Sequence, residues 1–319
     1  MKKTSFFTTC ILSLVFGACQ NNEIDSPSNG KSTEMNSSIQ IEEVGAIHNE
    51  CMEAAYNAIN FSPLLNTRAS NTITVEDFTN ILGQTDAASY RRIGELKKLS
   101  GEELRIFVND YLNIDIPERS YKAISNMLYD SNFSYTKDYL TQTYNDISPE
   151  LEGFLDELTN ELKNAYTTAS IDFAIDKIHL KWTRKVKTQE DREAITTTIN
   201  VAKSSKEYWN KNISKWGVPN IIKQSTFRTI IGHAVAADCI CIIDFIRIGR
   251  QWVIPFWDKI AVAAAGTSVV YGIVGALEDR IISTNGEYIK FSNGETITYS
   301  ELKKMRYNAC AKAINNMQF

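Results

Sequence analysis

Hydrophobic residues recur along most of the chain at the three- and four-residue spacing that places them on one face of an α-helix. The first such stripe consists of Val44, Ile47, His48, Cys51, Ala55 and Ile59. Two later stripes, at 151–162 and 171–182, are equally regular. The pattern predicts a series of amphipathic helices from residue 39 onward.

Helix starts are marked by side chains that can accept a hydrogen bond from a backbone N–H two or three residues further along. Pairs with this capping spacing are Thr74–Asp77, Ser100–Glu103 and Thr188–Asp191. Ser148 followed by Pro149 is a fourth start, because proline is well suited to the first turn of a helix. We expect a helix to begin at each of these points.

Two longer apolar stretches, 230–246 and 260–277, are not amphipathic. The second runs from Ile260 to Leu277 without a charge and would be about 27 Å long as a helix, close to the hydrocarbon core of a bilayer. The first contains His233, Asp238 and Asp244, which are costly in lipid. We expect residues 229–282 to form an apolar helical hairpin buried by the other helices. A concealed membrane-insertion hairpin, as in pore-forming toxins, is the alternative.

Near the C-terminus the pattern changes to short alternating runs around Asn293-Gly294, which is a strong hairpin signal. We expect a β-hairpin at 286–299 and a terminal helix at 300–316, capped by Ser300. The predicted fold class is therefore mainly α: a multi-helix globular domain with a central apolar helical hairpin and one small C-terminal β-hairpin. Only 15 glycines and 6 prolines among 319 residues disfavour a turn-rich all-β chain.

The first residues have the character of an export signal. Two lysines precede a short apolar run that ends in Gly17-Ala18-Cys19, and the run is too short to span a bilayer. The small residues before Cys19 resemble the lipobox of bacterial lipoproteins. This resemblance implies a signal peptide at 1–18, cleavage after Ala18 and a lipid on Cys19.

Residues 19–38 contain almost no apolar side chains, so we expect a flexible, lipid-anchored tether with a reach on the order of 25 Å. The helical domain then spans 39–319.

The segment Gly45-Ala46-Ile47-His48-Asn49 follows this tether. Together with the lipobox it resembles a start common in uncharacterised Bacteroidota lipoproteins, over the N-terminal part of the chain up to about residue 60 and with the motif G-x-x-H-N. The resemblance implies an outer-membrane lipoprotein of the cell envelope, on either the surface or the periplasmic face. The membrane is the expected partner through the lipid on Cys19, and a protein partner remains open.

The chain has 34 Lys and Arg residues against 38 Asp and Glu, a formal net charge of −4. This balance argues against a nucleic-acid-binding protein, which needs a basic face. It also argues against a general dependence on attraction to anionic lipids.

None of the familiar motifs for nucleotides, zinc proteases, serine hydrolases or calcium is found in the sequence, so we predict no catalytic residue, cofactor or metal site. His48, on the apolar stripe, is interpreted as a partly buried structural residue whose polar atoms are satisfied, and His179 as solvated. His233 lies five residues before Asp238. We interpret these two as a buried polar pair, with metal or proton chemistry as the open alternative.

Cysteine usage permits one disulfide. Cys10 leaves with the signal peptide and Cys19 carries lipid, which leaves Cys51, Cys239, Cys241 and Cys310 in an exported domain. Cys239 and Cys241 would point in different directions on a helix and form no metal clip. Cys51 and Cys310 are the candidate disulfide, provided that the first and last helices pack together.

Three functions are compatible with these observations. The first is a lipid-anchored envelope protein that acts without catalysis, by binding or scaffolding at the outer membrane. The second is a membrane-inserting antibacterial toxin that uses residues 229–282 after proteolytic release, with Arg68 in the polar loop 61–71 as the candidate cleavage site. The third is an unrecognised envelope hydrolase.

Overall fold

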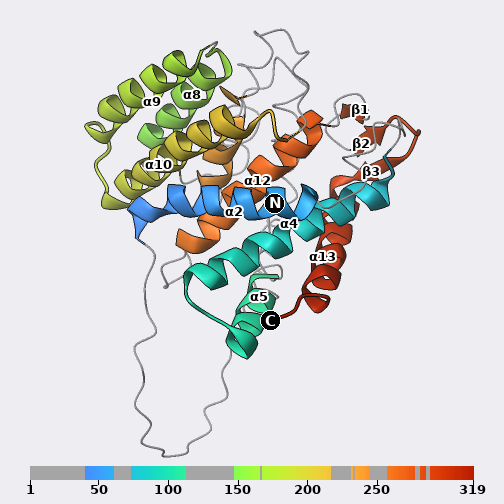
Figure 1. The fold of residues 1–319 in the computed structure, drawn as a ribbon. Coiled ribbons are helices and arrows are strands. Elements are labelled where there is room, and N and C mark those ends of the chain that lie inside the picture. Colours follow the sequence, from blue (N-terminus) through green and yellow to red (C-terminus); the bar gives the residue numbers. More distant parts are fainter. Residues whose placement is uncertain are drawn as a thin grey trace, which may run out of the picture. The chain divides into compact units, whose positions relative to one another are not determined.

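The computed structural model describes residues 40–60, 73–112, 147–165, 167–216, 231–232, 234–243, 257–276, 281–284 and 288–319 (Figure 1). Residues 38–319 form one compact unit. The elements of this unit are η1 (Ile41–Glu43), α2 (Val44–Asn60), α4 (Val75–Leu96), α5 (Gly101–Leu112), α8 (Pro149–Lys163), α9 (Thr168–Thr183), α10 (Gln189–Asn212), α12 (Trp257–Ala276), β1 (Ile281–Thr284), β2 (Tyr288–Phe291), β3 (Thr296–Thr298) and α13 (Tyr299–Asn315). Residues 231–232 and 234–243 are also helical. The predicted mainly α fold class is confirmed.

Three of the predicted helix starts are confirmed by their capping bonds. Thr74 caps α4, since its Oγ1 accepts from the backbone N–H of Asp77 at 3.0 Å and the Asp77 carboxylate accepts from the N–H of Thr74. Thr188 caps α10, and Ser148 caps α8 with Pro149 in the first turn. Each bond satisfies a backbone donor that the helix itself leaves unpaired.

Helices α8, α9 and α10 pack against one another and lie together in Figure 1. Their facing sides are the apolar stripes expected from the sequence. The buried residues on α8 include Leu151, Phe154, Leu155, Leu158 and Leu162, and those on α9 include Ile171, Ala174, Ile178 and Trp182. The opposite side of α9 consequently faces outward.

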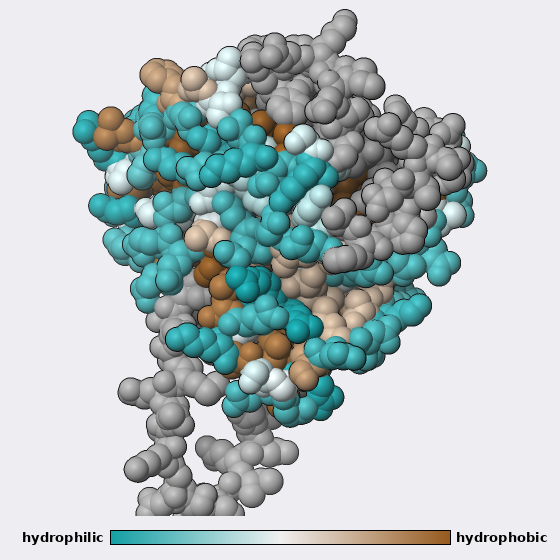
Figure 2. All heavy atoms as spheres, viewed as in Figure 1, coloured by the Kyte–Doolittle hydropathy of each residue, from teal (hydrophilic) through white to brown (hydrophobic). Residues whose placement is uncertain are grey.

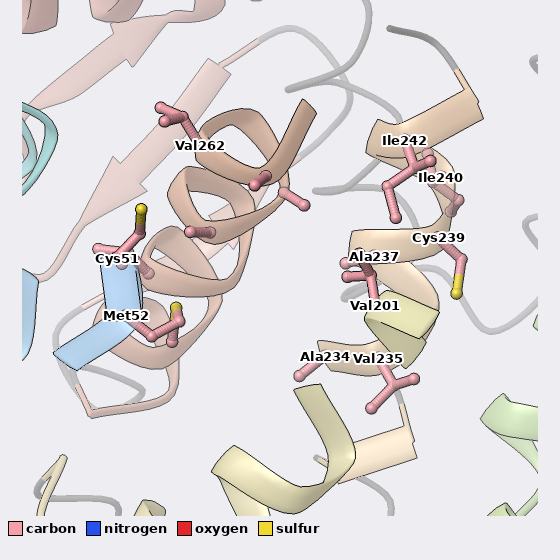
Figure 3. Packing of buried hydrophobic residues seen from close by; sticks show 14 of the residues in the cluster. Cys51, Met52, Val201, Ala234, Val235, Ala237, Cys239, Ile240, Ile242 and Val262 are labelled. Carbon is pink, nitrogen blue, oxygen red and sulfur yellow. The ribbon is translucent and has the colours of Figure 1, made fainter. Parts of the chain in front are cut away.

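Helix α2 occupies a central position because it packs against α4, α10 and α12. Figure 3 shows buried side chains of α2, α10, residues 234–242 and α12, which belong to one hydrophobic cluster. All described side chains from 234 to 243 are buried, as are those from Ile260 to Val269 on α12. The predicted apolar segment 260–277 therefore starts at a buried residue of α12, whereas its other end, Leu277, lies outside the described residues.

No helix within the described ranges is both long and apolar enough to cross a membrane.

Two glycines allow helices to cross closely. A Cβ on Gly45 of α2 would lie 2.4 Å from Ser204 Oγ and 2.6 Å from the Asn200 carbonyl oxygen on α10. A Cβ on Gly83 of α4 would lie 2.5 Å from backbone and Cβ atoms of Ala309 on α13. No side chain fits at such distances, so both crossings depend on glycine.

The C-terminal sheet is larger than predicted. Strands β2 and β3 form the expected antiparallel hairpin, with Ile289 opposite Ile297 and Gly294 in the turn at φ 91°. Strand β1 adds an antiparallel neighbour to β2, with an irregularity between Ile281 and Ser283. Four residues such as Ile281–Thr284 carry too little pattern to be recognised as a strand by periodicity alone.

The terminal helix starts slightly earlier than expected, and its cap is Thr298 instead of Ser300. Thr298 Oγ1 accepts from the backbone N–H of Glu301 at 3.2 Å, and the Glu301 carboxylate accepts from the Thr298 N–H at 3.0 Å. This reciprocal pair fixes the helix start directly at the end of β3.

The disulfide predicted between Cys51 and Cys310 is not formed, because both are free, buried thiols. The premise of that prediction was that the first and last helices pack together. Instead, α2 and α13 each pack mainly against α4. Cys51 donates a hydrogen bond to the carbonyl oxygen of Ser89 on α4, at 3.9 Å, whereas Cys310 lies at the α13 crossing beside Gly83.

Burial raises the pKa of Cys51, Cys239 and Cys310 well above the ordinary thiol value. The native protein is therefore expected to resist alkylation at neutral pH, since only the thiolate reacts readily. Iodoacetamide followed by mass spectrometry should leave these three thiols, and the buried Cys241, unmodified until the chain is unfolded. All four should then react without a reductant. Modification of the native protein, or a thiol that needs reduction first, would contradict the structure.

The same shifts predict how stability changes with pH. Unfolded thiols ionise near about pH 8.5, whereas the folded protein keeps its thiol protons to higher pH. Unfolding thus releases protons above that point, and stability should fall as the pH rises beyond about 8.5. Urea unfolding at about pH 7 and at about pH 9.5 measures the difference. Equal stability at both values would be inconsistent with buried thiols.

Candidate functional site

The residues with the most chemical potential form one buried polar cluster, defined as His48, Ser205, Trp209, Asp238 and Ser268. Asp238 is its centre: Ser205 Oγ donates to Oδ2 at 2.5 Å, and Ser268 Oγ lies 2.6 Å from both carboxylate oxygens. Trp209 Nε1 donates to Ser268 Oγ at 3.3 Å. The five side chains come from α2, α10, the helical residues 234–243 and α12, so the cluster joins four segments that are distant in sequence.

His48 completes the cluster from α2. Its Nε2 lies 3.3 Å from Asp238 Oδ2, which is ion-pair distance but does not meet hydrogen-bond geometry. Its Nδ1 lies 2.9 Å from Asn49 Oδ1, and Asn49 Nδ2 donates to the Ser204 carbonyl oxygen at 2.9 Å. The amide thus faces the ring with its acceptor, so Nδ1 is the nitrogen that carries a proton.

The G-x-x-H-N motif has a direct structural meaning here. Gly45 allows α2 to approach α10, His48 reaches Asp238, and Asn49 binds the α10 backbone at Ser204. The three fixed positions of the motif therefore all serve the contact of α2 with α10 and the buried polar cluster. The motif describes a helix junction and does not by itself indicate a reaction.

The cluster is closed to solvent. His48, Ser205, Asp238 and Ser268 are each 0% exposed, and Trp209 is 1% exposed. A carboxylate at such a position needs several donors, because burial without them costs several kcal/mol. Ser205 and Ser268 supply two such donors, so the observed geometry is that of a carboxylate held in place.

This geometry differs from a nucleophilic relay. In a serine hydrolase the hydroxyl donates to an imidazole, which is held in turn by a carboxylate. Here Ser205 and Ser268 donate to Asp238 itself, and His48 approaches the same carboxylate from another side. Neither hydroxyl is positioned against the imidazole, and as arranged the cluster ties helices together.

The histidine predictions have different outcomes. His48 is more buried than expected, at 0% exposed, and within the described residues its Nε2 has no hydrogen-bond partner, although a satisfied side chain was expected. His179 is partly exposed, and its pKa is lowered by partial burial and by the nearby Lys203. The predicted pair of His233 with Asp238 cannot be followed, since His233 lies outside the described residues, but Asp238 does lie against a histidine, namely His48.

Three members of the cluster were not anticipated from the sequence. Ser205 and Trp209 lie on the buried side of α10, and Ser268 lies in the apolar run of α12. The sequence could have indicated a buried polar residue where a hydroxyl side chain occurs among apolar neighbours, as in Gly266-Thr267-Ser268-Val269-Val270. Such a residue must find a buried partner, but the sequence does not identify that partner.

The other candidate residues are divided between the described and undescribed parts of the chain. The lipidation residue Cys19, the candidate cleavage residue Arg68 and the segment end Leu277 lie outside the described residues. Ile260, the other segment end, is 0% exposed. Within the described ranges, no group of three or more His, Cys, Asp or Glu side chains is arranged to hold a metal ion.

A second candidate site lies on the surface of α9. Phe173 and Leu180 are 69% and 57% exposed, the two highest values among the large hydrophobic side chains of the described residues. Together with Lys177 and Arg184 they follow one line along the helix, at spacings of four, three and four residues. We call these four residues the α9 ridge. Toward the upper left of Figure 2, where Figure 1 places α9, brown residues stand out from a mainly teal surface.

The flank of the α9 ridge is held by charged contacts with α8. Lys181 Nζ and Trp182 Nε1 both donate to Glu157 Oε2, at 2.5 and 2.8 Å. Partial burial tends to raise the pKa of Glu157, but these two hydrogen bonds outweigh it and the pKa is lowered. Glu157 is therefore a stable anion at neutral pH, and α9 keeps a fixed orientation on α8.

Comparison with known proteins gives no further guide: no protein-family model, curated protein or solved structure matches this chain.

Proposed function

We propose that this chain is a lipid-anchored protein of the cell envelope that acts without catalysis, by binding or scaffolding at the outer membrane. The observation that carries the proposal is the α9 ridge, where two large apolar side chains lie exposed next to two cations. Exposed apolar surface of this kind is typical of contact surfaces. The closed geometry of the buried polar cluster supports the same interpretation, since its hydroxyls already serve Asp238.

The anchor is tested by lipid incorporation. Cells that express the full chain are grown with labelled palmitate, and the protein is isolated. The wild type should be labelled and Cys19→Ser should not, since Cys19 is the proposed acceptor. Cys10→Ser provides a matched control because this residue lies within the proposed signal peptide and should leave labelling unchanged. An unlabelled wild type, or label retained in Cys19→Ser, would refute the anchor.

A second candidate function, the membrane-inserting toxin, is favoured by one observation. The described side chains of 234–243 and of the first half of α12 are enclosed by other helices of the unit, as a concealed insertion segment would be. Asp238 opposes this function, since insertion would carry a carboxylate into lipid or break its bonds. Dye release from liposomes by soluble protein, intact and after limited trypsin cleavage, distinguishes the two functions. Leakage only after cleavage would favour the toxin.

A further inference from the structure

The charge along α9 differs from that of the whole chain. Between residues 177 and 189 there is no Asp or Glu, whereas Lys177, Lys181, Arg184, Lys185 and Lys187 all fall in this interval. The chain as a whole carries a formal charge of −4. Leu180 of the α9 ridge lies within this basic interval, whereas Phe173 lies just before it, between Asp172 and Asp176, which pair with Lys206 and Lys203.

Not all of these cations are available to a partner. Lys177, Lys181 and Lys187 form ion pairs with Glu161, Glu157 and Glu150, at 3.4, 2.5 and 3.4 Å. Arg184 and Lys185 are exposed, and within the described residues neither forms an ion pair with a carboxylate. Lys185 Nζ lies 4.4 Å from the centroid of the Trp182 ring, which holds it at the end of the helix. Among the described residues, these two cations near Leu180 are thus not neutralised by a carboxylate.

The α9 ridge also lies near the point where the tether joins the domain. Helices α9 and α10 run antiparallel, since Lys203 pairs with Asp176 and Lys206 with Asp172. Continuing this register brings Asn200 level with the turn of α9 that carries Leu180. Asn200 Nδ2 donates to the carbonyl oxygen of Ile41, at the start of the described domain. The described part of the domain thus begins one helix away from the ridge.

We propose that the α9 ridge rests on an anionic bilayer surface, with Phe173 and Leu180 at the acyl boundary and Arg184 and Lys185 against lipid phosphates. Large apolar side chains flanked by Lys and Arg are typical of helices that lie in the membrane interface. This inference rests on the proposed lipid anchor. A tether with a reach on the order of 25 Å keeps the domain at high local concentration near the bilayer, so a weak contact suffices.

The test places a fluorescent reporter on the ridge. Leu180→Cys is labelled with an environment-sensitive dye in the full lipidated protein and reconstituted into vesicles with or without anionic phospholipid. Ile106→Cys is the matched control, since Ile106 is a similarly exposed apolar residue, at 54%, on α5. The native buried thiols are expected not to react, and unsubstituted protein carried through the same labelling measures any background.

We expect the emission at position 180 to shift to shorter wavelength in anionic vesicles and the emission at position 106 to stay unchanged. The double variant Arg184→Gln/Lys185→Gln, labelled at position 180, should lose most of that shift. High salt should weaken the shift in the parent protein, because exposed charges are screened.

Three results would overturn the proposal. If the emission at position 180, like that at position 106, does not change in anionic vesicles, the ridge faces water. If the emission shift at position 180 increases with the density of protein on the vesicles and does not depend on anionic lipid, the ridge binds a second copy of the chain or another protein. Flotation of the vesicles gives a separate measure of anchoring: protein left behind would refute the anchor and the inference together, whereas floating protein without the shift would refute the inference alone.

Discussion

Replacing Asp238 with alanine is expected to destabilise the protein by about 3–5 kcal/mol. The substitution removes the acceptor of Ser205 and Ser268 and the carboxylate that lies 3.3 Å from His48 Nε2, and these three partner side chains are 0% exposed. Each buried polar group left without a partner costs about 1–3 kcal/mol. Since domains are commonly stable by only about 5–15 kcal/mol, this loss is large. Urea unfolding monitored by circular dichroism measures it.

The losses of stability compared among several variants are more informative than the loss measured for Asp238→Ala alone. Ser205→Ala and Ser268→Ala each remove one donor to the carboxylate and should cost about 1.5–3 kcal/mol, the net value of a hydrogen bond to a charged group. Ser268→Ala also removes the acceptor of Trp209 Nε1. Once Asp238 is alanine, neither serine substitution should cost as much, because its acceptor is gone. Asp176→Ala on α9, whose side chain is 67% exposed, is the control and should change stability little.

If Asp238→Ala lowers the free energy of unfolding by less than about 1 kcal/mol, this result would contradict the hydrogen bonds of the buried polar cluster. Additive effects in all double variants would contradict these hydrogen bonds as well, since groups that share one carboxylate must be coupled.

Replacing Arg306 with methionine is expected to have a similarly large effect, about 3–5 kcal/mol. Arg306 on α13 and Asp86 on α4 form a bidentate ion pair, with Arg306 Nε donating to Asp86 Oδ2 at 2.5 Å and Nη2 donating to Oδ1. Arg306 is 4% exposed and Asp86 7%. The substitution leaves a buried carboxylate without its cation, and this is the costly state for a buried charge.

Helix α12 closes over this ion pair. A Cβ on Gly266 would lie 3.2 Å from Arg306 Nη2 and 3.8 Å from Asp86 Oδ1. Lysine at position 306 would supply the charge but not the planar two-donor fork, so Arg306→Lys should also destabilise, though less than methionine. The pair thus fixes how α4, α12 and α13 meet.

The decisive variant is the double substitution Arg306→Met/Asp86→Leu. Removing both charges avoids the buried carboxylate, so the double variant should be more stable than Arg306→Met alone. Arg105→Met on α5 serves as the exposed control, because the Arg105–Glu102 pair has side chains 55% and 62% exposed and should contribute little. Thermal unfolding of the wild type, the single variants Arg306→Met and Asp86→Leu, the double variant and Arg105→Met gives the comparison. A double variant less stable than either single one would refute the explanation.

The elements that sequence predicted well are those determined by local spacing. The stripe beginning at Val44 became α2, and the threonine caps at 74 and 188 start α4 and α10. The Asn-Gly turn gave the β2–β3 hairpin. In each case the decisive residues lie within a few positions of one another, where backbone geometry alone brings them together.

The contacts that sequence did not predict join residues that are far apart. The pairing of His48 with Asp238, and of Arg306 with Asp86, depends on which helices pack together, and several arrangements of amphipathic helices satisfy the same stripes. The error over Cys51 and Cys310 has this origin, since α4 separates their helices. Likewise, the periodicity of α9 identified its buried stripe but not the exposure of Phe173.

The central position of α2 has a consequence for how the chain reaches its native state. Synthesis produces α2 before any of its neighbours, yet Asn49 binds a carbonyl 155 residues further on, and α12 follows later still. Contacts across such long loops must first overcome the entropy of closing them, which slows folding. Until α12 is available, the apolar face of α2 has no complete cover and is open to aggregation. Among the described helices, α2 is therefore made early and is one of the last to be fully enclosed.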